Sequence, residues 1–410
     1  MNIPRKNRLL ALACAGLMLA AAASPAAAAV ATPARKATVT TASDLDRGEI
    51  VSAGLLASLS PRQVEEYLGQ AKLPVPSQVQ GVDLYAVVYR TVGVTGRRTT
   101  ASGVVALPHD ARDGLWTVSY EHGTMATKRY AGSVADGDGR AVPMMFAATG
   151  FAAVAPDYLG LGMGPGFHPY MDTATEASAS VDLLRAAREL AAAKDRTLSG
   201  DVLVTGFSQG GQATMALGRE LQRDRSLGFR LRGLAPIAGP YDVRGAELPE
   251  LLAGRLDPHS ATFYLAYWTV SMNRLHGFYR TPAQAFRDPA VERLFDGHHD
   301  FDEIAAGLPA SPRELITPAF WKRLQRPSGP LAKALDLNDT TCSDWRPEAP
   351  VRLFAGRGDR DVTILNSRNC LRDLRAGGAT ASLTDVGDVD HQTSVFRSFP
   401  IVLRWFERLR

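Results

Sequence analysis

The stretch Val202-Leu203-Val204-Thr205-Gly206-Phe207-Ser208-Gln209-Gly210 decides the fold expected for this chain. The apolar and β-branched run over 201–207 predicts a buried strand, and residues 209–223 predict a helix that begins directly after it. A serine with a glycine two residues to either side, at such a junction, is typical of a nucleophile elbow. In that strained strand-to-helix turn the serine oxygen is lifted clear of the sheet. We therefore expect Ser208 to be a catalytic nucleophile.

Outward from this turn, strands and helices alternate along most of the chain. Two β-rich runs, 82–89 and 99–107, predict an antiparallel hairpin. Later strands are expected at 115–120, 152–156, 231–237, 351–355 and 381–386, with helices from Ser60-Pro61 onward, at 173–193, at 363–374 and at the C-terminal end. Such alternation implies a parallel sheet covered on both faces. An antiparallel beginning followed by a doubly wound, mostly parallel sheet predicts an α/β class protein with the α/β-hydrolase fold.

Residues 241–346 interrupt the alternation. This stretch is helical in character, most clearly at 260–275, and many prolines break it. About a hundred residues between two strands are too many for a plain loop. We predict a helical cap, or lid, inserted at 241–346 over the active site. It would divide the hydrolase core into a first part, 30–240, and a second part, 347–410.

The first 29 residues have the features of a secretory signal peptide. Three basic residues, Arg5, Lys6 and Arg8, precede an apolar run at 9–23 that is shorter than the ~20 residues of a membrane span. We expect secretion to the periplasm or the medium, with no stable membrane anchor after processing. The formal charge of the whole chain is +4, and removing these three basic residues leaves +1. This balance argues against a nucleic-acid partner.

The cysteine count fits an oxidising compartment. The chain has three cysteines, and loss of the signal peptide with Cys14 leaves Cys342 and Cys370. An even pair in a secreted protein predicts one disulfide, and two buried free thiols are the alternative.

A serine nucleophile needs a histidine base and an orienting acid, and in this fold the chain order is serine, acid, histidine. The strand at 351–355 runs into a turn that carries Asp359 and Asp361, and the strand at 381–386 runs into a loop that carries His391. We predict Asp359 as the acid, with Asp361 as the cap of the next helix, and His391 as the base. The other seven histidines fit less well, because they lie before Ser208 or in the predicted cap.

Acyl transfer also needs backbone N–H groups aimed at the developing oxyanion. The strand at 115–120 runs into Glu121-His122-Gly123-Thr124. We predict that the amides of Thr124 and Gln209 form the oxyanion hole. The alternative is that His122-Gly123 is a turn without a catalytic role.

Further motifs carry a resemblance to a known family. The chain contains Pro156-Asp157-Tyr158-Leu159-Gly160-Leu161-Gly162, then His168-Pro169-Tyr170, and Trp345-Arg346-Pro347 before the acid strand. Together with the predicted catalytic triad of Ser208, Asp359 and His391, this set resembles the secretory-lipase branch of the α/β-hydrolases. That branch includes fungal lipases and bacterial secreted relatives. The resemblance covers residue 82 to the C-terminus. Val362-Thr363 stands where the family usually has Val-Pro.

The resemblance implies hydrolysis of small-molecule or lipid carboxylic esters, with a lid over the site and no cofactor. Two alternatives are a secreted serine peptidase of the same fold and a non-catalytic binding protein on a hydrolase scaffold. The run 298–303, which contains His298 and His299, is interpreted as a solvated turn of the cap rather than a metal site. The sequence predicts no particular oligomeric state.

Overall fold

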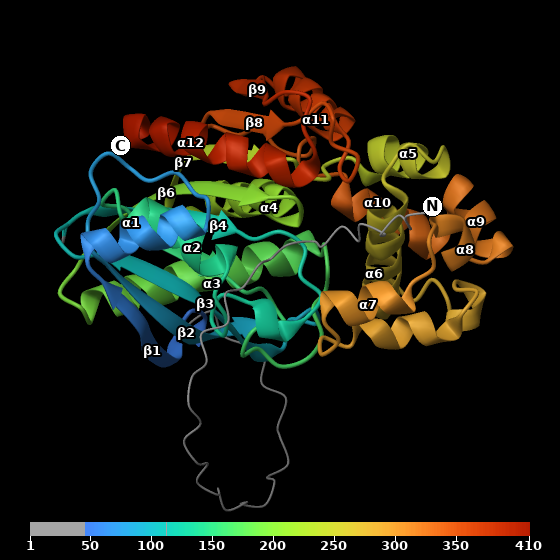
Figure 1. Cartoon of the computed structure of the whole chain (residues 1–410), viewed down its shortest axis with the longest axis horizontal. Helices are drawn as coiled ribbons and strands as arrows, with labels where there is room; N and C mark the ends of the chain where they lie inside the picture. Colours follow the sequence, from blue (N-terminus) through green and yellow to red (C-terminus); the bar gives the residue numbers. More distant parts are fainter. Residues whose placement is uncertain (1–45, 112) are drawn as a thin grey trace, which may run out of the picture. The chain divides into compact units, whose positions relative to one another are not determined.

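A nine-stranded sheet is the centre of the computed structural model, which describes residues 46–111 and 113–410. The strands are β1 (Ile50–Leu59), β2 (Val82–Val92), β3 (Arg98–Pro108), β4 (Leu115–Glu121), β5 (Ala152–Pro156), β6 (Leu198–Phe207), β7 (Arg230–Ile237), β8 (Val351–Ala355) and β9 (Ala381–Asp385). Across the sheet their order is β1-β2-β3-β5-β4-β6-β7-β8-β9. The first three pairings are antiparallel and the other five are parallel. The predicted mostly parallel sheet with an antiparallel beginning is confirmed (Figure 1).

Helices cover both faces of this sheet. One face packs against α3 (Thr173–Ala192), α4 (Gln209–Arg223) and α11 (Ile364–Ala376), and the other against α1 (Pro61–Gln70), α2 (Asp138–Ala147) and α12 (His391–Leu409). Because helices cover both faces, the central strands are buried on both sides and consist of continuous apolar runs, which is why the sequence predicted them. In β5, for example, all five residues are buried.

Two elements near the N-terminus were not predicted. Strand β1 is an edge strand, so most of its residues are exposed and it shows no clean alternation of apolar and polar residues. Helix α2 contains Pro143, which disfavours a helix in the sequence pattern. Its burial against β3, β4 and β5 offsets that local preference. The predicted hairpin is confirmed, with β2 and β3 paired in register from Val82↔Pro108 to Val92↔Arg98.

Between β7 and β8 the chain leaves the sheet and forms a region of helices. They comprise a π-helical turn (η4, Val243–Glu247), α5 (Leu248–Leu252), α6 (Pro258–His276), α7 (Phe301–Gly307), α8 (Pro312–Leu315), α9 (Pro318–Gln325) and α10 (Gly329–Asn338). Figure 1 shows α5–α10 grouped together on one side of the sheet. The region has its own apolar core, which includes Trp268, Phe286 and Phe320.

The longest of these helices, α6, has clear start and stop signals. Asp257 caps it by accepting the N–H groups of His259 and Ser260, Pro258 occupies its first turn, and Gly277 ends it with φ +63°. Polar contacts join this region to the loops that follow β4 and β5. The Tyr267 hydroxyl donates to Met125 O at 3.0 Å. The helices therefore lie against the carboxyl edge of the sheet.

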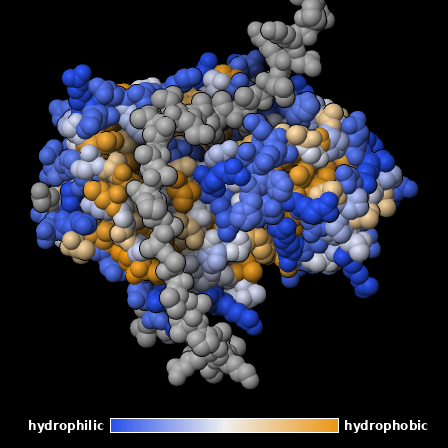
Figure 2. Space-filling model, turned by 60° about the horizontal axis from the view of Figure 1, so that its bottom comes forward, coloured by the Kyte–Doolittle hydropathy of each residue, from blue (hydrophilic) through white to orange (hydrophobic). Residues whose placement is uncertain are grey.

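In the view of Figure 2, hydrophobic residues lie in separate areas among mostly hydrophilic ones. Two of the exposed large apolar side chains, Val51 and Leu55, belong to the edge strand β1. Within the described residues, no helix has the length and apolarity needed to cross a membrane. The predicted signal peptide, residues 1–29, lies outside the described residues.

The predicted disulfide between Cys342 and Cys370 is confirmed. Cys342 lies just before β8, and Cys370 lies in α11, the helix that follows it. Both cysteines are buried in the core on one face of the sheet. The bridge closes a segment with a sequence separation of 28 residues that includes Asp359.

Removing this bridge is expected to destabilise the protein without changing its fold. For a closed loop of this length, the chain-entropy model predicts a loss of about 3.6 kcal/mol. We expect the Cys342→Ser, Cys370→Ser double variant to have a lower thermal midpoint than wild type, and dithiothreitol to lower the wild-type midpoint by the same amount. Equal midpoints for oxidised and reduced wild type would contradict this.

Candidate active site

Ser208 occupies the junction between β6 and α4 in a strained conformation. Its φ is 57° and its ψ is −122°, a region that residues with a Cβ rarely adopt. The Ser208 N–H donates to Ile237 O on the neighbouring strand β7 at 2.9 Å. This bond anchors the turn to the centre of the sheet.

The glycines around Ser208 are needed because three backbone segments meet there. A Cβ on Gly206 would lie 2.2 Å from Gly210 O, and a Cβ on Gly210 would lie 1.9 Å from Glu121 O at the end of β4. Both neighbours are backbone atoms that cannot rotate away. A Cβ on Gly123 would lie 3.6 Å from the Ser208 Cβ. The turn after β4 therefore lies directly against Ser208.

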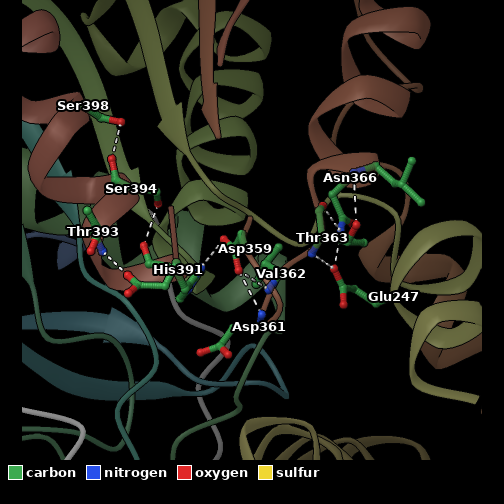
Figure 3. A network of polar contacts seen from close by, with 12 residues as sticks. Glu247, Asp359, Asp361, Val362, Thr363, Asn366, His391, Thr393, Ser394 and Ser398 are labelled. Atoms are coloured by element: carbon green, nitrogen blue, oxygen red, sulfur yellow. Dashed lines mark hydrogen bonds and ion pairs between the residues drawn. The ribbon is translucent and has the colours of Figure 1, made fainter. Parts of the chain in front are cut away.

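His391 and Asp359 form a buried pair (Figure 3). His391 is the first residue of α12, and its Nδ1 lies 2.6 Å from Asp359 Oδ2. Because a carboxylate accepts, Nδ1–H donates, and Nε2 is left as the basic nitrogen. This Nε2 is buried and has no hydrogen-bond partner among the described residues. The His391 ring packs on Phe207, the residue before Ser208, with ring centroids 4.5 Å apart.

The acid is held by its own turn. Asp359 follows β8, and its Oδ1 accepts the N–H groups of Asp361 and Val362, each at 2.9 Å. The prediction that Asp361 caps the next helix was wrong. Thr363 is the cap of α11, because the backbone at Asp361 is turned toward Asp359 and the helix begins later. The Asp361 side chain instead lies close to Ser260 on α6.

Three carboxyl groups surround the base. Burial lowers the pKa of His391, but the charge and hydrogen bond of Asp359 and the charges of Asp361 and Glu247 outweigh burial and raise that pKa above its ordinary value. Burial also raises the pKa of Asp361. Positive charge on the imidazole is therefore favoured, as a base that accepts a proton during the reaction requires.

Sequence reasoning missed Glu247, because it is far from Asp359 along the chain. It ends η4, and its carboxylate accepts the N–H of Thr363 at 2.9 Å and a bond from the Asn366 side chain (Figure 3). Burial raises the pKa of Glu247 to about 8. Through Glu247, the helical region is joined to the turn that carries the acid.

The predicted oxyanion residues lie on either side of the elbow. Gln209 is the first residue of α4, where the backbone N–H has no partner within the helix. Thr124 follows Gly123 in the turn after β4, and its hydroxyl lies 2.9 Å from the Tyr170 hydroxyl. The nearby His122 is buried, with its ring nitrogens at 2.7 Å from Gly123 O and 3.2 Å from Asp157 O. The His122 ring thus contacts the backbone of this turn and of the segment that follows β5.

Residues 298–303 have a structural role at the start of α7. Asp300 caps that helix, and Asp300 and Glu303 form a reciprocal capping box. His299 Nδ1 lies 3.0 Å from Asp296 Oδ1. Over residues 46–111 and 113–410, no group of three or more metal-ligating side chains comes together.

The fold defines the class of protein, which is the α/β-hydrolase fold. Ser208 lies at a strand-to-helix turn of the kind that carries the nucleophile in this fold. The structure is similar to the rice cell wall degrading esterase LipA from Xanthomonas oryzae, with a TM-score of 0.81 and 26% identity over 89% of this chain and 100% of that chain. It is also similar to a candidate hydrolase from Legionella pneumophila, with a TM-score of 0.80 and 27% identity over 88% of this chain and 98% of that chain.

A third similar structure is the closed state of Candida antarctica lipase A, with a TM-score of 0.65 over 88% of this chain and 83% of that chain. At 14% identity this likeness shows the fold alone. No family model and no curated protein matches the chain. The predicted resemblance to bacterial relatives of secretory lipases is confirmed at the level of structure, and it supports a hydrolase that acts on esters.

Gly210 tests the packing of the elbow. In Gly210→Ala the new Cβ meets Glu121 O, so we expect a loss of stability near the upper end of the ~1–3 kcal/mol that overpacking costs. Gly69→Ala is the matched control, since Gly69 also lies in a helix and a Cβ there meets nothing within 4 Å. Chemical denaturation measures both. Similar stabilities for the two variants would show that the close approach at Gly210 is not a constraint.

Asp361→Asn tests the electrostatics of the base. Removing this negative charge favours neutral imidazole, so the pKa of His391 falls. The acid limb of kcat/KM is then expected to move to lower pH, by about 1 unit. Asp388→Asn, which removes an exposed carboxylate three residues before His391, should leave the limb in place. An unmoved or upward-shifted limb in Asp361→Asn would contradict the account.

Proposed function

We propose that this protein is a secreted serine esterase or lipase that cleaves carboxylic esters with Ser208 as nucleophile, His391 as base and Asp359 as orienting acid. The observation that carries the proposal is the buried His391–Asp359 hydrogen bond, which leaves Nε2 as the basic nitrogen near the strained elbow. The same order of groups along the chain serves acyl transfer in this fold. The likeness to esterases supports the ester as the bond that is cleaved.

The reaction follows from these positions. His391 Nε2 takes the proton of the Ser208 hydroxyl while the oxygen attacks the ester carbonyl carbon, and Asp359 stabilises the imidazolium. The N–H groups of Thr124 and Gln209 stabilise the negative oxygen. When the C–O bond breaks, His391 returns the proton to the leaving alcohol. Water then repeats the sequence on the acyl-enzyme, which releases the carboxylic acid and restores Ser208.

Secretion is supported by two features. Residues 1–29 predict a signal peptide, and the Cys342–Cys370 disulfide fits an oxidising compartment. We further propose that the helices of 241–346 act as the cap over the site, since α6 approaches Asp361 through Ser260. The Xanthomonas oryzae esterase is named for degrading rice cell wall, so esters of plant cell walls are substrates to include beside soluble ones.

Hydrolysis of p-nitrophenyl esters from acetate to palmitate tests this function. The wild type, purified after expression of the full chain, should hydrolyse part of this series. Ser208→Ala should lose at least about 10⁴-fold in kcat, because removal of one triad member disables the whole unit. Ser382→Ala, which changes an exposed serine on β9, should keep wild-type rates. A folded wild type that cleaves none of the series, or an active Ser208→Ala, would contradict the proposal.

A further inference from the structure

The loop between β5 and α3 is tightly packed, both against neighbouring segments and within itself. Asp157 accepts the Ser102 hydroxyl at 2.6 Å and the Ser133 N–H at 3.2 Å. Gly160 has φ +74°, and a Cβ there would lie 2.1 Å from the carbonyl carbon of Phe167. Only glycine fits such a position without strain. This packing fixes the segment that follows, His168-Pro169-Tyr170, at the back of the candidate active site.

His168 holds the side chain of Gln209. His168 Nδ1 lies 3.0 Å from Leu159 O, so this nitrogen carries the hydrogen and donates. His168 Nε2 is then an acceptor, and Gln209 Nε2 donates to it at 2.9 Å. Burial lowers the pKa of His168 to about 3, so the ring is neutral, as this arrangement requires.

Glu176 takes the second hydrogen of the same amide. Gln209 Nε2 donates to Glu176 Oε1 at 2.6 Å, so both N–H bonds of the Gln209 side chain are used. Gln209, His168 and Glu176 are all buried. The amide oxygen of Gln209 is buried without a hydrogen-bond partner among the described residues, so these two donated bonds are what holds the side chain, and the backbone of Gln209 with it.

Tyr170 contacts the other predicted oxyanion residue. Its hydroxyl lies 2.9 Å from Thr124 Oγ1, and its ring stacks on Tyr267 of α6 with centroids 4.2 Å apart. The stacking leaves the Tyr170 hydroxyl directed at Thr124. One short segment after β5 thus contacts both residues whose amides are expected to bind the oxyanion.

We propose that His168, Tyr170 and Glu176 are positioning residues for the oxyanion hole. His168 and Glu176 hold Gln209, and Tyr170 holds Thr124, so that both N–H groups are in place before the substrate binds. The inference rests on the proposed function, and it adds the residues that hold the oxyanion hole in place. Preorganised donors of this kind stabilise negative charge without reorganising during the reaction.

The buried surroundings of Glu176 favour its uncharged form. Burial raises the pKa of Glu176 to about 8, against the hydrogen bond from Gln209 and with help from neighbouring carboxylates. Its Oε2 is buried without a hydrogen-bond partner among the described residues, so no donor stabilises a negative charge there. The titratable groups that interact with Glu176 are Asp172, Glu121, Tyr158 and Tyr170, and His168 accepts from the same Gln209 amide. Ionisation of Glu176 at alkaline pH would place a negative charge beside the developing oxyanion. That charge would weaken the stabilisation of the oxyanion.

The test compares kcat per active site, titrated with a p-nitrophenyl phosphonate that labels the nucleophile. His168→Leu and Tyr170→Phe should each lower kcat by at least about 10-fold, since outright loss of one oxyanion donor costs about 10²–10³. KM should change little, because the oxyanion forms only in the transition state. Tyr89→Phe is the matched control, a buried tyrosine whose hydroxyl donates to Ala179 O elsewhere in the core. It should lose stability without losing kcat.

Glu176→Gln keeps the acceptor for Gln209 and cannot ionise. It should retain kcat at pH 7 within about 3-fold. We expect the kcat of the wild type to decline above pH about 8, where Glu176 ionises, and that of Glu176→Gln not to decline there. Asp182→Asn neutralises another buried acid of α3, which bonds Thr91 and Arg47 instead. This control should keep the alkaline decline. Retention of that decline in Glu176→Gln would overturn the role of Glu176.

Failure of this inference can be separated from failure of the proposed function. If the wild type hydrolyses no ester, the function fails, but the rate at which the phosphonate labels Ser208 still reports on the oxyanion hole. Slower labelling of His168→Leu and Tyr170→Phe than of wild type and Tyr89→Phe supports the inference. Unchanged kcat per titrated site, or unchanged labelling rates, in both variants overturns it.

Discussion

The close approach of β4, β6 and the start of α4 is the constraint on which the rest of the site depends. The three backbones meet at Gly206 and Gly210 with no room for a Cβ, and Ser208 is held between them with a positive φ. A turn of this kind is stable only where neighbouring strands fix it from both sides, as β4 and β7 do for β6. The carboxyl edge of a parallel sheet then collects the other groups, because β8 and the segment after β9 end at the same edge.

Charge is distributed unevenly across this edge. On the side of the base, Asp359, Asp361 and Glu247 favour the positive imidazolium that forms when His391 takes a proton. On the side of the predicted oxyanion hole, the buried acids Glu121 and Glu176 both have a raised pKa. Glu121 is bonded by the hydroxyls of Ser119 and Ser180. Burial raises the pKa of Glu247 and Asp361 as well, so the difference between the two sides lies in what the carboxyl groups face. On one side they face a base that becomes positive, and on the other an oxygen that becomes negative.

Local patterns were enough to predict the sheet, the hairpin and the disulfide, since apolar runs, turn signals and cysteine number are visible in short windows. They also predicted residues that the structure brings together, His391 and Asp359, because chain order in this fold is informative. The edge strand β1 was missed because consecutive residues of it are exposed, on both faces of the sheet, so that no apolar alternation marks it. Glu247 and Glu176 were missed because a carboxyl group becomes significant only through burial and partners distant in sequence. His168 and Tyr170 were noticed as part of a motif, but their contacts with Gln209 and Thr124 arise only in the folded loop.

The central claim is that Ser208 is the nucleophile of an acyl-transfer site. Reaction of the intact protein with a fluorophosphonate, followed by mass spectrometry of the peptides, tests it most directly. We expect one adduct per chain, on Ser208, and loss of the adduct when His391 is replaced by glutamine. An unmodified protein, or an adduct on a different serine, would contradict it.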